Sequence, residues 1–155
     1  MSLSHSEHSL FQNTPAPLTT PWGHRDMSCR SIAPGIWSVS TDCHGGIVIS
    51  EERRDAMPAW AADFRPFSGL DTAFEEDLDW AVPCAVWPQE FKLDDCCAAI
   101  KTLEHRLVYF TDRGLDVDAA LARLATAELP RGRGSVMNEA SEAEMENAGI
   151  EDTGR

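Results

Sequence analysis

Apolar and polar positions alternate over residues 36–41, where Trp37 and Val39 are separated by serines. This period of two is typical of a half-buried β-strand. The apolar run 47–49 has no polar interruption and indicates a strand covered on both faces. Five residues separate the two runs: Asp42, Cys43, His44, Gly45 and Gly46. We predict a β-hairpin in which the glycine pair supplies positive φ angles at the turn.

Two further segments have strand character. Residues 29–33 precede a Pro-Gly turn and predict an extended segment leading into the hairpin. Residues 81–88 are apolar and β-prone, but Pro83 has no N–H group for a strand ladder. We therefore place this second segment at a sheet edge or a bulge.

Helical periodicity appears three times. Residues 51–57 begin with acidic side chains after Ser50, a favourable N-cap, and end before a proline. Residues 91–112 carry apolar side chains at helical spacing, and residues 116–127 repeat this pattern after Asp116, a second N-cap. The expected fold class is α+β: a small antiparallel sheet of three or four strands with two C-terminal helices packed on one face.

The two ends of the chain differ from its middle in composition. Residues 1–19 are rich in Ser, Thr and Pro, and residues 130–155 are acidic and lack Leu, Phe and Trp. Such segments bury too little apolar surface to offset their chain entropy, so we expect both to be disordered tails. One α+β domain is expected over residues 20–129, with a long loop at 58–72 pinned by single aromatic residues.

The net charge of −13 narrows the classes of partner. A field of this sign repels phosphate backbones and favours basic proteins, so we expect a basic protein partner and no direct nucleic-acid binding. The five cysteines form no C-x-x-C pair, and no apolar run is long enough to span a membrane. We expect a cytoplasmic protein without membrane contact, metal or cofactor.

Cys43 and His44 are the first candidates for chemical reactivity. An imidazole can lower the pKa of a thiol, and backbone N–H groups freed by Gly45 and Gly46 can stabilise developing negative charge. Adjacent residues on a turn rarely point at each other, however. No sequence motif identifies a third residue that would orient the imidazole. A structural turn and a partner contact therefore remain alternatives to nucleophilic catalysis.

A run of acidic residues between Phe74 and Trp80 is the second candidate. Its members are Glu75, Glu76, Asp77 and Asp79. Clustered carboxylates can bind a cation, share a proton or present an anionic patch to an Arg-rich partner. The glycine-bearing loop of a typical calcium site is absent here. The simpler alternative is that the run is a solvent-exposed charged segment leading into a strand.

The five tryptophans form the third candidate set. Tryptophan is frequent at binding hot spots, but a core of this size also needs large side chains to fill it. We expect four of them in the core. Trp60, in the long loop, is expected to be exposed and to join Cys43, His44, Gly45, Gly46 and the acidic run in a partner-binding surface.

The order of these motifs resembles an uncharacterised domain carried by phage, plasmid and bacterial proteins. That domain has a Ser/Thr-x-x-His-Gly-Gly hairpin, here beginning at Thr41, followed by an aromatic-Glu-Glu-Asp-x-x-Trp stretch, here beginning at Phe74. The resemblance covers about residues 20–110. Cys43 and Phe74 depart from it, since a serine and a tyrosine are commoner there. The family implies no activity that can be transferred.

A looser resemblance is to antirestriction proteins of the ArdB/KlcA type, which share a Gly-x-Trp strand, a two-glycine bend and a late amphipathic helix. It implies a mobile-element protein that blocks a host defence complex of the restriction or CRISPR type. The expected function is therefore a non-enzymatic acidic inhibitor. A small hydrolase using His44, Cys43 and a carboxylate, and a structural accessory domain without a site, remain alternatives.

Overall fold

Four antiparallel strands form the main sheet of the computed structural model, which describes residues 15–24 and 28–127. The strands lie in chain order, β3-β4-β5-β6, so each pairs with its sequence neighbour. Their bounds are β3 (Ser28–Ala33), β4 (Ile36–Ser40), β5 (Gly45–Ile49) and β6 (Ala73–Glu75). The α+β class and the antiparallel sheet of the sequence analysis are confirmed.

The predicted hairpin is present, but its turn is shorter than expected. β4 and β5 pair from Ile36 with Ile49 to Ser40 with Gly45. Gly45 and Gly46 are therefore strand residues, and neither has a positive φ angle. The prediction that the glycine pair forms the bend is wrong, because the pair serves close packing instead.

Different elements pack against the two faces of the sheet. Side chains alternate along β4 and β5, so the helix face carries Ile36, Ile47, Ile49 and Phe74, which join the large core cluster. The outer face carries Trp37, Val39, Val48 and Ala73, a smaller cluster packed against Ala16 and Trp22. The strand at 47–49 is buried on both faces, as its apolar run predicted.

Residues 15–24 cover part of the outer face. They include a two-stranded ribbon, β1 (Thr19–Thr20) and β2 (Gly23–His24), in which Thr19 pairs with His24. Ala16, which was expected to lie in the N-terminal tail, therefore packs against the sheet. The remainder of both expected tails, 1–14 and 130–155, lies outside the described residues.

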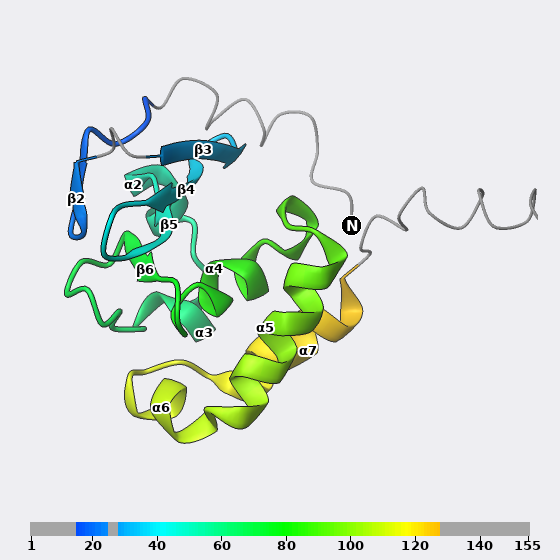
Figure 1. Cartoon of the computed structure of the whole chain (residues 1–155). Coiled ribbons are helices and arrows are strands. Elements are labelled where there is room, and N and C mark those ends of the chain that lie inside the picture. The colour runs from blue at the N-terminus through cyan, green and yellow to red at the C-terminus, as the bar shows by residue number, and fades with distance from the viewer. Residues whose placement is uncertain (1–14, 25–27, 128–155) are drawn as a thin grey trace, which may run out of the picture.

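Helices form a layer against the helix face of the sheet (Figure 1). α4 lies between the sheet and the long α5, and it packs against both α5 and α7. The helical elements are α2 (Glu51–Asp55), α3 (Ala59–Ala62), α4 (Ala81–Val86), the 3-10 turn η1 (Pro88–Glu90), α5 (Leu93–His105), α6 (Leu107–Asp112) and α7 (Val117–Thr126).

The expected edge strand at 81–88 is wrong, because residues 81–86 form helix α4. Every side chain of α4 is buried, so its sequence has no polar position to reveal a helical period. Pro83 lies in the first turn, where a missing N–H group breaks no intrahelical bond. The fourth strand of the sheet is instead β6, which ends at Glu75, the first residue of the acidic run.

The single helix expected over 91–112 is divided into α5 and α6. Arg106 leaves the helical conformation, with φ −122° and ψ 31°. Leu103 and Phe110, on either side of the break, are buried, whereas Leu107, which directly follows the break and belongs to the apolar positions at helical spacing, is 48% exposed. α6 thereby presents an apolar side chain to solvent.

The two predicted N-caps are confirmed. The N–H group of Arg53 donates to Oγ of Ser50 (3.1 Å), and the N–H group of Ala119 donates to Oδ1 of Asp116 (3.0 Å). Each oxygen satisfies a backbone donor that the helix leaves without a partner. These starts fix α2 beside the sheet and α7 beside α4.

Candidate functional site

The bend of the hairpin is held by Thr41. The Oγ1 of Thr41 donates to the carbonyl of His44 (2.8 Å), and the Thr41 N–H group donates to the same carbonyl (2.9 Å). The Thr41 hydroxyl also accepts from the N–H groups of Cys43 and His44 (3.4 and 3.3 Å). The side chains of Cys43 and His44 are both exposed at this end of the sheet.

The acidic run lies directly beside this bend. β6 pairs with β5 so that Glu75 stands opposite Gly46, and the N–H group of Glu76 donates to the carbonyl of Gly45 (3.0 Å). Glu76 and Asp77 are exposed, and Glu75 is half-buried. The structure thus brings together His44 and three of the four predicted carboxylates, although more than 30 residues of chain separate them in sequence.

Gly45 and Gly46 make this close approach possible. A Cβ atom at Gly46 would overlap the carbonyl oxygen of Phe74 and would lie 2.7 Å from the indole of Trp22. A Cβ atom at Gly45 would lie 2.5 Å from the carbonyl oxygen of Val39. Both glycines are buried, so their role is to seat β6 and Trp22 rather than to contact a partner.

The electrostatics of Glu75 reflect this crowding. Partial burial raises its pKa, and the neighbouring carboxylates Asp77 and Asp79 raise it further. The hydrogen bond between the carboxyl groups of Glu75 and Asp77 acts in the same direction, whereas the electrostatic interaction with His44 lowers the pKa of Glu75. Like charges held this close favour the binding of an external cation.

Asp79 does not belong to the exposed surface, and its predicted place there is wrong. Its side chain is 0% exposed. Its Oδ2 accepts from the N–H group of Phe67 (2.6 Å), and its Oδ1 accepts from the hydroxyl of Tyr109 (2.7 Å). Asp79 therefore ties the loop before β6 to α6, which is a structural role.

Trp60 also lies elsewhere. It is on α3, its carbonyl accepts from the N–H group of Asp116 (3.1 Å), and its half-buried side chain packs against the core. The expectation that Trp60 is the exposed tryptophan is thus wrong. Trp37 and Trp87 are buried, whereas Trp22 and Trp80 are half-buried like Trp60.

A buried arginine was not foreseen. Arg53 is 2% exposed, and its Nε and Nη2 donate to the carbonyl of Pro34 (3.0 and 2.9 Å). Its guanidinium lies 5.1 Å from the ring centre of Trp87 and 3.9 Å from Oε1 of Glu90. Burial lowers the pKa of Arg53, and Glu90 opposes this shift. In the sequence, Arg53 looks like an ordinary charged residue in the first turn of a helix. No local pattern therefore indicates that it is buried.

The chemistry available at the end of the sheet is that of an open anionic surface. Among the described residues, no hydrogen bond joins the Cys43 thiol to the His44 imidazole, and no group of three His, Cys, Asp or Glu side chains is arranged to hold a metal ion. We define the sheet-end surface as the five predicted residues that are brought together and reach solvent: Cys43, His44, Glu75, Glu76 and Asp77.

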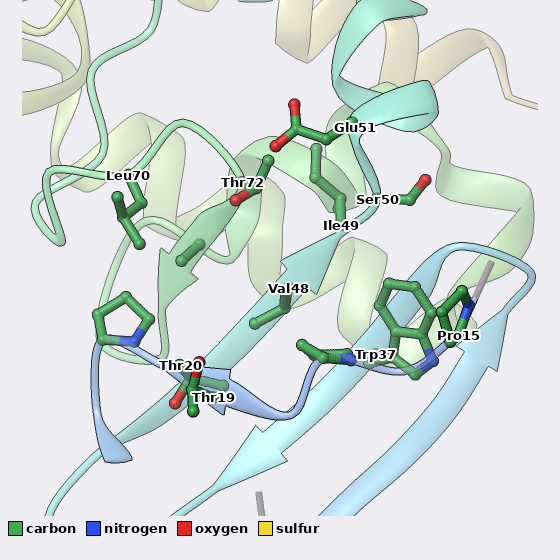
Figure 2. Close-up of a pocket in the computed structure, with 13 residues that line it drawn as sticks. Pro15, Thr19, Thr20, Trp37, Val48, Ile49, Ser50, Glu51, Leu70 and Thr72 are labelled. Atoms are coloured by element: carbon green, nitrogen blue, oxygen red, sulfur yellow. The ribbon is translucent and has the colours of Figure 1, made fainter. Parts of the chain in front are cut away.

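A separate shallow groove of about 220 Å³ lies on the outer face (Figure 2). Trp37 and Pro15 form one end, Val48 lies in the middle, and Leu70 and Thr72 form the other end. The residues that line it carry one ionisable side chain, Glu51, within the described part of the chain. The groove contains none of the predicted site residues, so it is distinct from the sheet-end surface.

One of three comparisons with known proteins gives a match. No curated protein and no solved structure shows a significant match to it. Within the described residues, every helix is too short or too polar to cross a membrane. A family model described as a domain of unknown function, DUF7007, matches residues 15–109, which is consistent with the expectation of an uncharacterised domain. Since this match spans more than half of the chain, the protein belongs to the DUF7007 family.

Proposed function

We propose that this protein is a non-enzymatic binding protein whose sheet-end surface contacts a basic protein partner. The observation that carries this proposal is the pairing of β5 with β6, which sets Glu75, Glu76 and Asp77 beside the exposed bend at His44. A rigid sheet holds these charges in place, so binding does not require them to be ordered first.

The negative charge of this surface is not neutralised within the described residues. Ion pairs with arginine there use Glu90, Asp55 and Asp71, and none uses Glu75, Glu76 or Asp77. His44 is the one basic side chain among the described residues that acts on Glu75. A partner that brings Lys or Arg side chains would supply the missing counter-charge and would be steered by the overall field.

Binding fits the geometry better than hydrolysis does. Cys43 and His44 are both open to water, where electrostatic stabilisation of a reaction intermediate is weak. A thiolate nucleophile also needs an imidazole within hydrogen-bond reach. The described residues provide the carboxylates but not this thiol–imidazole pair.

The partner class that we propose is a basic subunit of a host defence complex, of the restriction or CRISPR type, in the cytoplasm. Such complexes hold nucleic acid on Lys- and Arg-rich surfaces. A phage- or plasmid-encoded protein with a net charge of −13 can compete for such a surface without binding nucleic acid itself. The resemblance to antirestriction proteins supports the same class.

The test is protection of an unmodified phage in cells that carry a defined restriction or CRISPR-type system. Three versions of the full chain are expressed: the wild type, the triple variant E75Q/E76Q/D77N, and the control D94N/D95N/D118N. The control removes three exposed acids from α5 and α7. We expect the wild type and the control to raise the plating efficiency, and the triple variant to lose this effect. No protection by the wild type, or equal protection by the triple variant, would reject the proposal.

A further inference from the structure

Two cysteines meet inside the helical layer. Cys84 lies in α4 and Cys96 lies near the start of α5, and the two side chains are 0% and 1% exposed. The thiol of Cys84 donates to Sγ of Cys96, and the two sulfur atoms are 3.8 Å apart. The two residues are 12 positions apart in the sequence, so no short cysteine motif indicates that they form a pair. The proposed function uses neither of them.

The two sulfur atoms are close enough to bond without a change of fold. The S–S distance of a disulfide is about 2.05 Å, so the sulfurs need to approach by about 1.8 Å from their separation of 3.8 Å. Rotation of two short side chains about their Cα–Cβ bonds gives a movement of this size. Since α4 and α5 already pack against each other, both helices can keep their positions.

Loss of the two thiol hydrogens leaves the nearby backbone satisfied. The thiol of Cys96 donates to the carbonyl of Pro88 (3.4 Å), and this hydrogen bond ends when a disulfide forms. The same carbonyl also accepts from the N–H group of Phe91 (3.3 Å), which oxidation does not change. A buried acceptor without a donor is costly, so this second donor allows oxidation within the folded protein.

The two thiols differ in reactivity. Burial, and to a smaller extent the Asp95 carboxylate, raises the pKa of both. The hydrogen bond between them lowers the pKa of Cys96 and raises that of Cys84, so Cys96 is the first to form a thiolate. Cys96 also lies near a helix start at which the N-cap residue, Lys92, makes no side-chain capping bond. Local opening of such a start brings Cys96 to solvent while α4 stays buried.

We propose that Cys84 and Cys96 are the site of a reversible disulfide, which forms when the folded protein reacts with a hydroperoxide. The Cys96 thiolate attacks one peroxide oxygen and breaks the O–O bond, which gives a sulfenic acid and releases an alcohol. The sulfur of Cys84 then bonds to the Cys96 sulfur and displaces water. Overall, the thiol pair loses two electrons and two protons, and the hydroperoxide takes them up as one alcohol and one water. With hydrogen peroxide both products are water.

The disulfide links two helices of the core covalently. Cross-linking positions that are a short loop apart restricts the unfolded chain, and for a loop of this length the unfolding constant falls by up to about a hundredfold. Thiol exchange in a reducing compartment restores the dithiol, so the link is transient, as intracellular disulfides usually are. This modification acts on the stability of the helical layer. It is separate from the sheet-end surface and does not depend on the proposed partner.

The test uses the full chain and variants that isolate the pair. The variant C29S/C43S/C97S keeps only Cys84 and Cys96, and two further variants add either C84S or C96S to it. Cys43 and Cys97 are replaced because they are exposed and can link one chain to another. Each folded protein is treated with hydrogen peroxide at neutral pH without denaturant. It is then alkylated in denaturant and digested for mass spectrometry.

We expect C29S/C43S/C97S to stay a monomer, to lose both free thiols and to yield the Cys84 and Cys96 peptides joined to each other. The wild type should yield the same joined peptides, and dithiothreitol should separate them. With C84S added, dimedone should trap a sulfenic acid at Cys96, whereas with C96S added Cys84 should stay reduced. In urea, the unfolding constant of oxidised C29S/C43S/C97S should be about ten- to a hundredfold lower than that of its reduced form.

Other results overturn the inference in distinguishable ways. If both thiols of folded C29S/C43S/C97S survive the peroxide, the pair is closed to oxidants. A link that forms only in urea would belong to the unfolded chain. A higher unfolding constant after oxidation would show that the folded positions of Cys84 and Cys96 do not suit the bond. If Cys96 of the wild type is joined to Cys97 instead, the proposed pairing is wrong.

Discussion

The charged residues of this protein occupy two contrasting environments. Arg53 and Asp79 are buried, and each has defined hydrogen-bond partners from distant parts of the chain. Glu76 and Asp77 reach solvent at the end of the sheet and make no ion pair with Lys or Arg in the described residues. Asp77 and Asp79 are only two positions apart, so local sequence does not decide between a structural role and an available one.

The largest expected effect comes from removing a buried charge. Arg53→Ala leaves the Pro34 carbonyl without its donor and Glu90 without its counter-charge, and it removes the contact with Trp87. We expect the free energy of unfolding to fall by about 3–5 kcal/mol. Urea denaturation measures this change. An effect below about 1 kcal/mol would show that buried charges here are not structural.

Asp79→Asn tests the same contrast inside the acidic run. The substitution removes the charge that accepts from the Phe67 N–H group and the Tyr109 hydroxyl. We expect a loss of about 2–3 kcal/mol in the free energy of unfolding, because hydrogen bonds to charged groups are strong. Asp77→Asn is the control and should change stability by less than about 0.5 kcal/mol. Equal effects of the two variants would remove the distinction between them.

Gly46→Ala tests whether the sheet beneath the exposed charges is closely packed. The added Cβ would overlap the Phe74 carbonyl and approach the Trp22 indole. We expect a loss of about 1–3 kcal/mol from overpacking, with a change in tryptophan fluorescence as Trp22 is displaced. Gly69→Ala is a comparison with open space around its Cβ, although its φ angle of +80° adds strain of another kind. Unchanged fluorescence in Gly46→Ala would contradict the close approach.

The smallest effect concerns Glu75 and pH. Its pKa is raised above the ordinary 4.5, so the folded protein holds this proton more tightly than the unfolded chain does. Ionised Glu75 therefore lowers stability above its folded pKa, and the penalty disappears as the pH falls below the unfolded pKa. We expect Glu75→Gln to stabilise by a few tenths of a kcal/mol at pH 7, given its partial exposure, and by nothing near pH 4. Destabilisation at pH 7 would contradict the sign.

Local signals in the sequence predicted part of this fold. Ser50 and Asp116 cap their helices as expected, and the alternation at Trp37 and Val39 gave the correct strand. The two caps depend on contacts three residues apart. The strand is marked by a local period of two, although its hydrogen-bond partners lie on neighbouring strands. The strand expected at 81–88 is a helix because a uniformly apolar run contains no period to separate the two structures.

The candidate site shows the same division. The expected surface joined His44 to the acidic run, but the strand expected beside that run was residues 81–88, which form a helix. The two are brought together instead by β6, which pairs with β5 and ends at Glu75. The burial of Asp79 depends on Tyr109, 30 positions away, and no local pattern encodes that contact.

The salt dependence of binding to the purified defence complex that we propose as the partner tests the central claim most directly. Wild type and D94N/D95N/D118N should bind with a dissociation constant that rises steeply with salt, because exposed charges are screened within about 10 Å at 0.1 M ionic strength. E75Q/E76Q/D77N should bind weakly at every salt concentration, with a shallow dependence. An unchanged affinity and salt dependence in E75Q/E76Q/D77N would contradict the assignment of the sheet-end surface as the contact site.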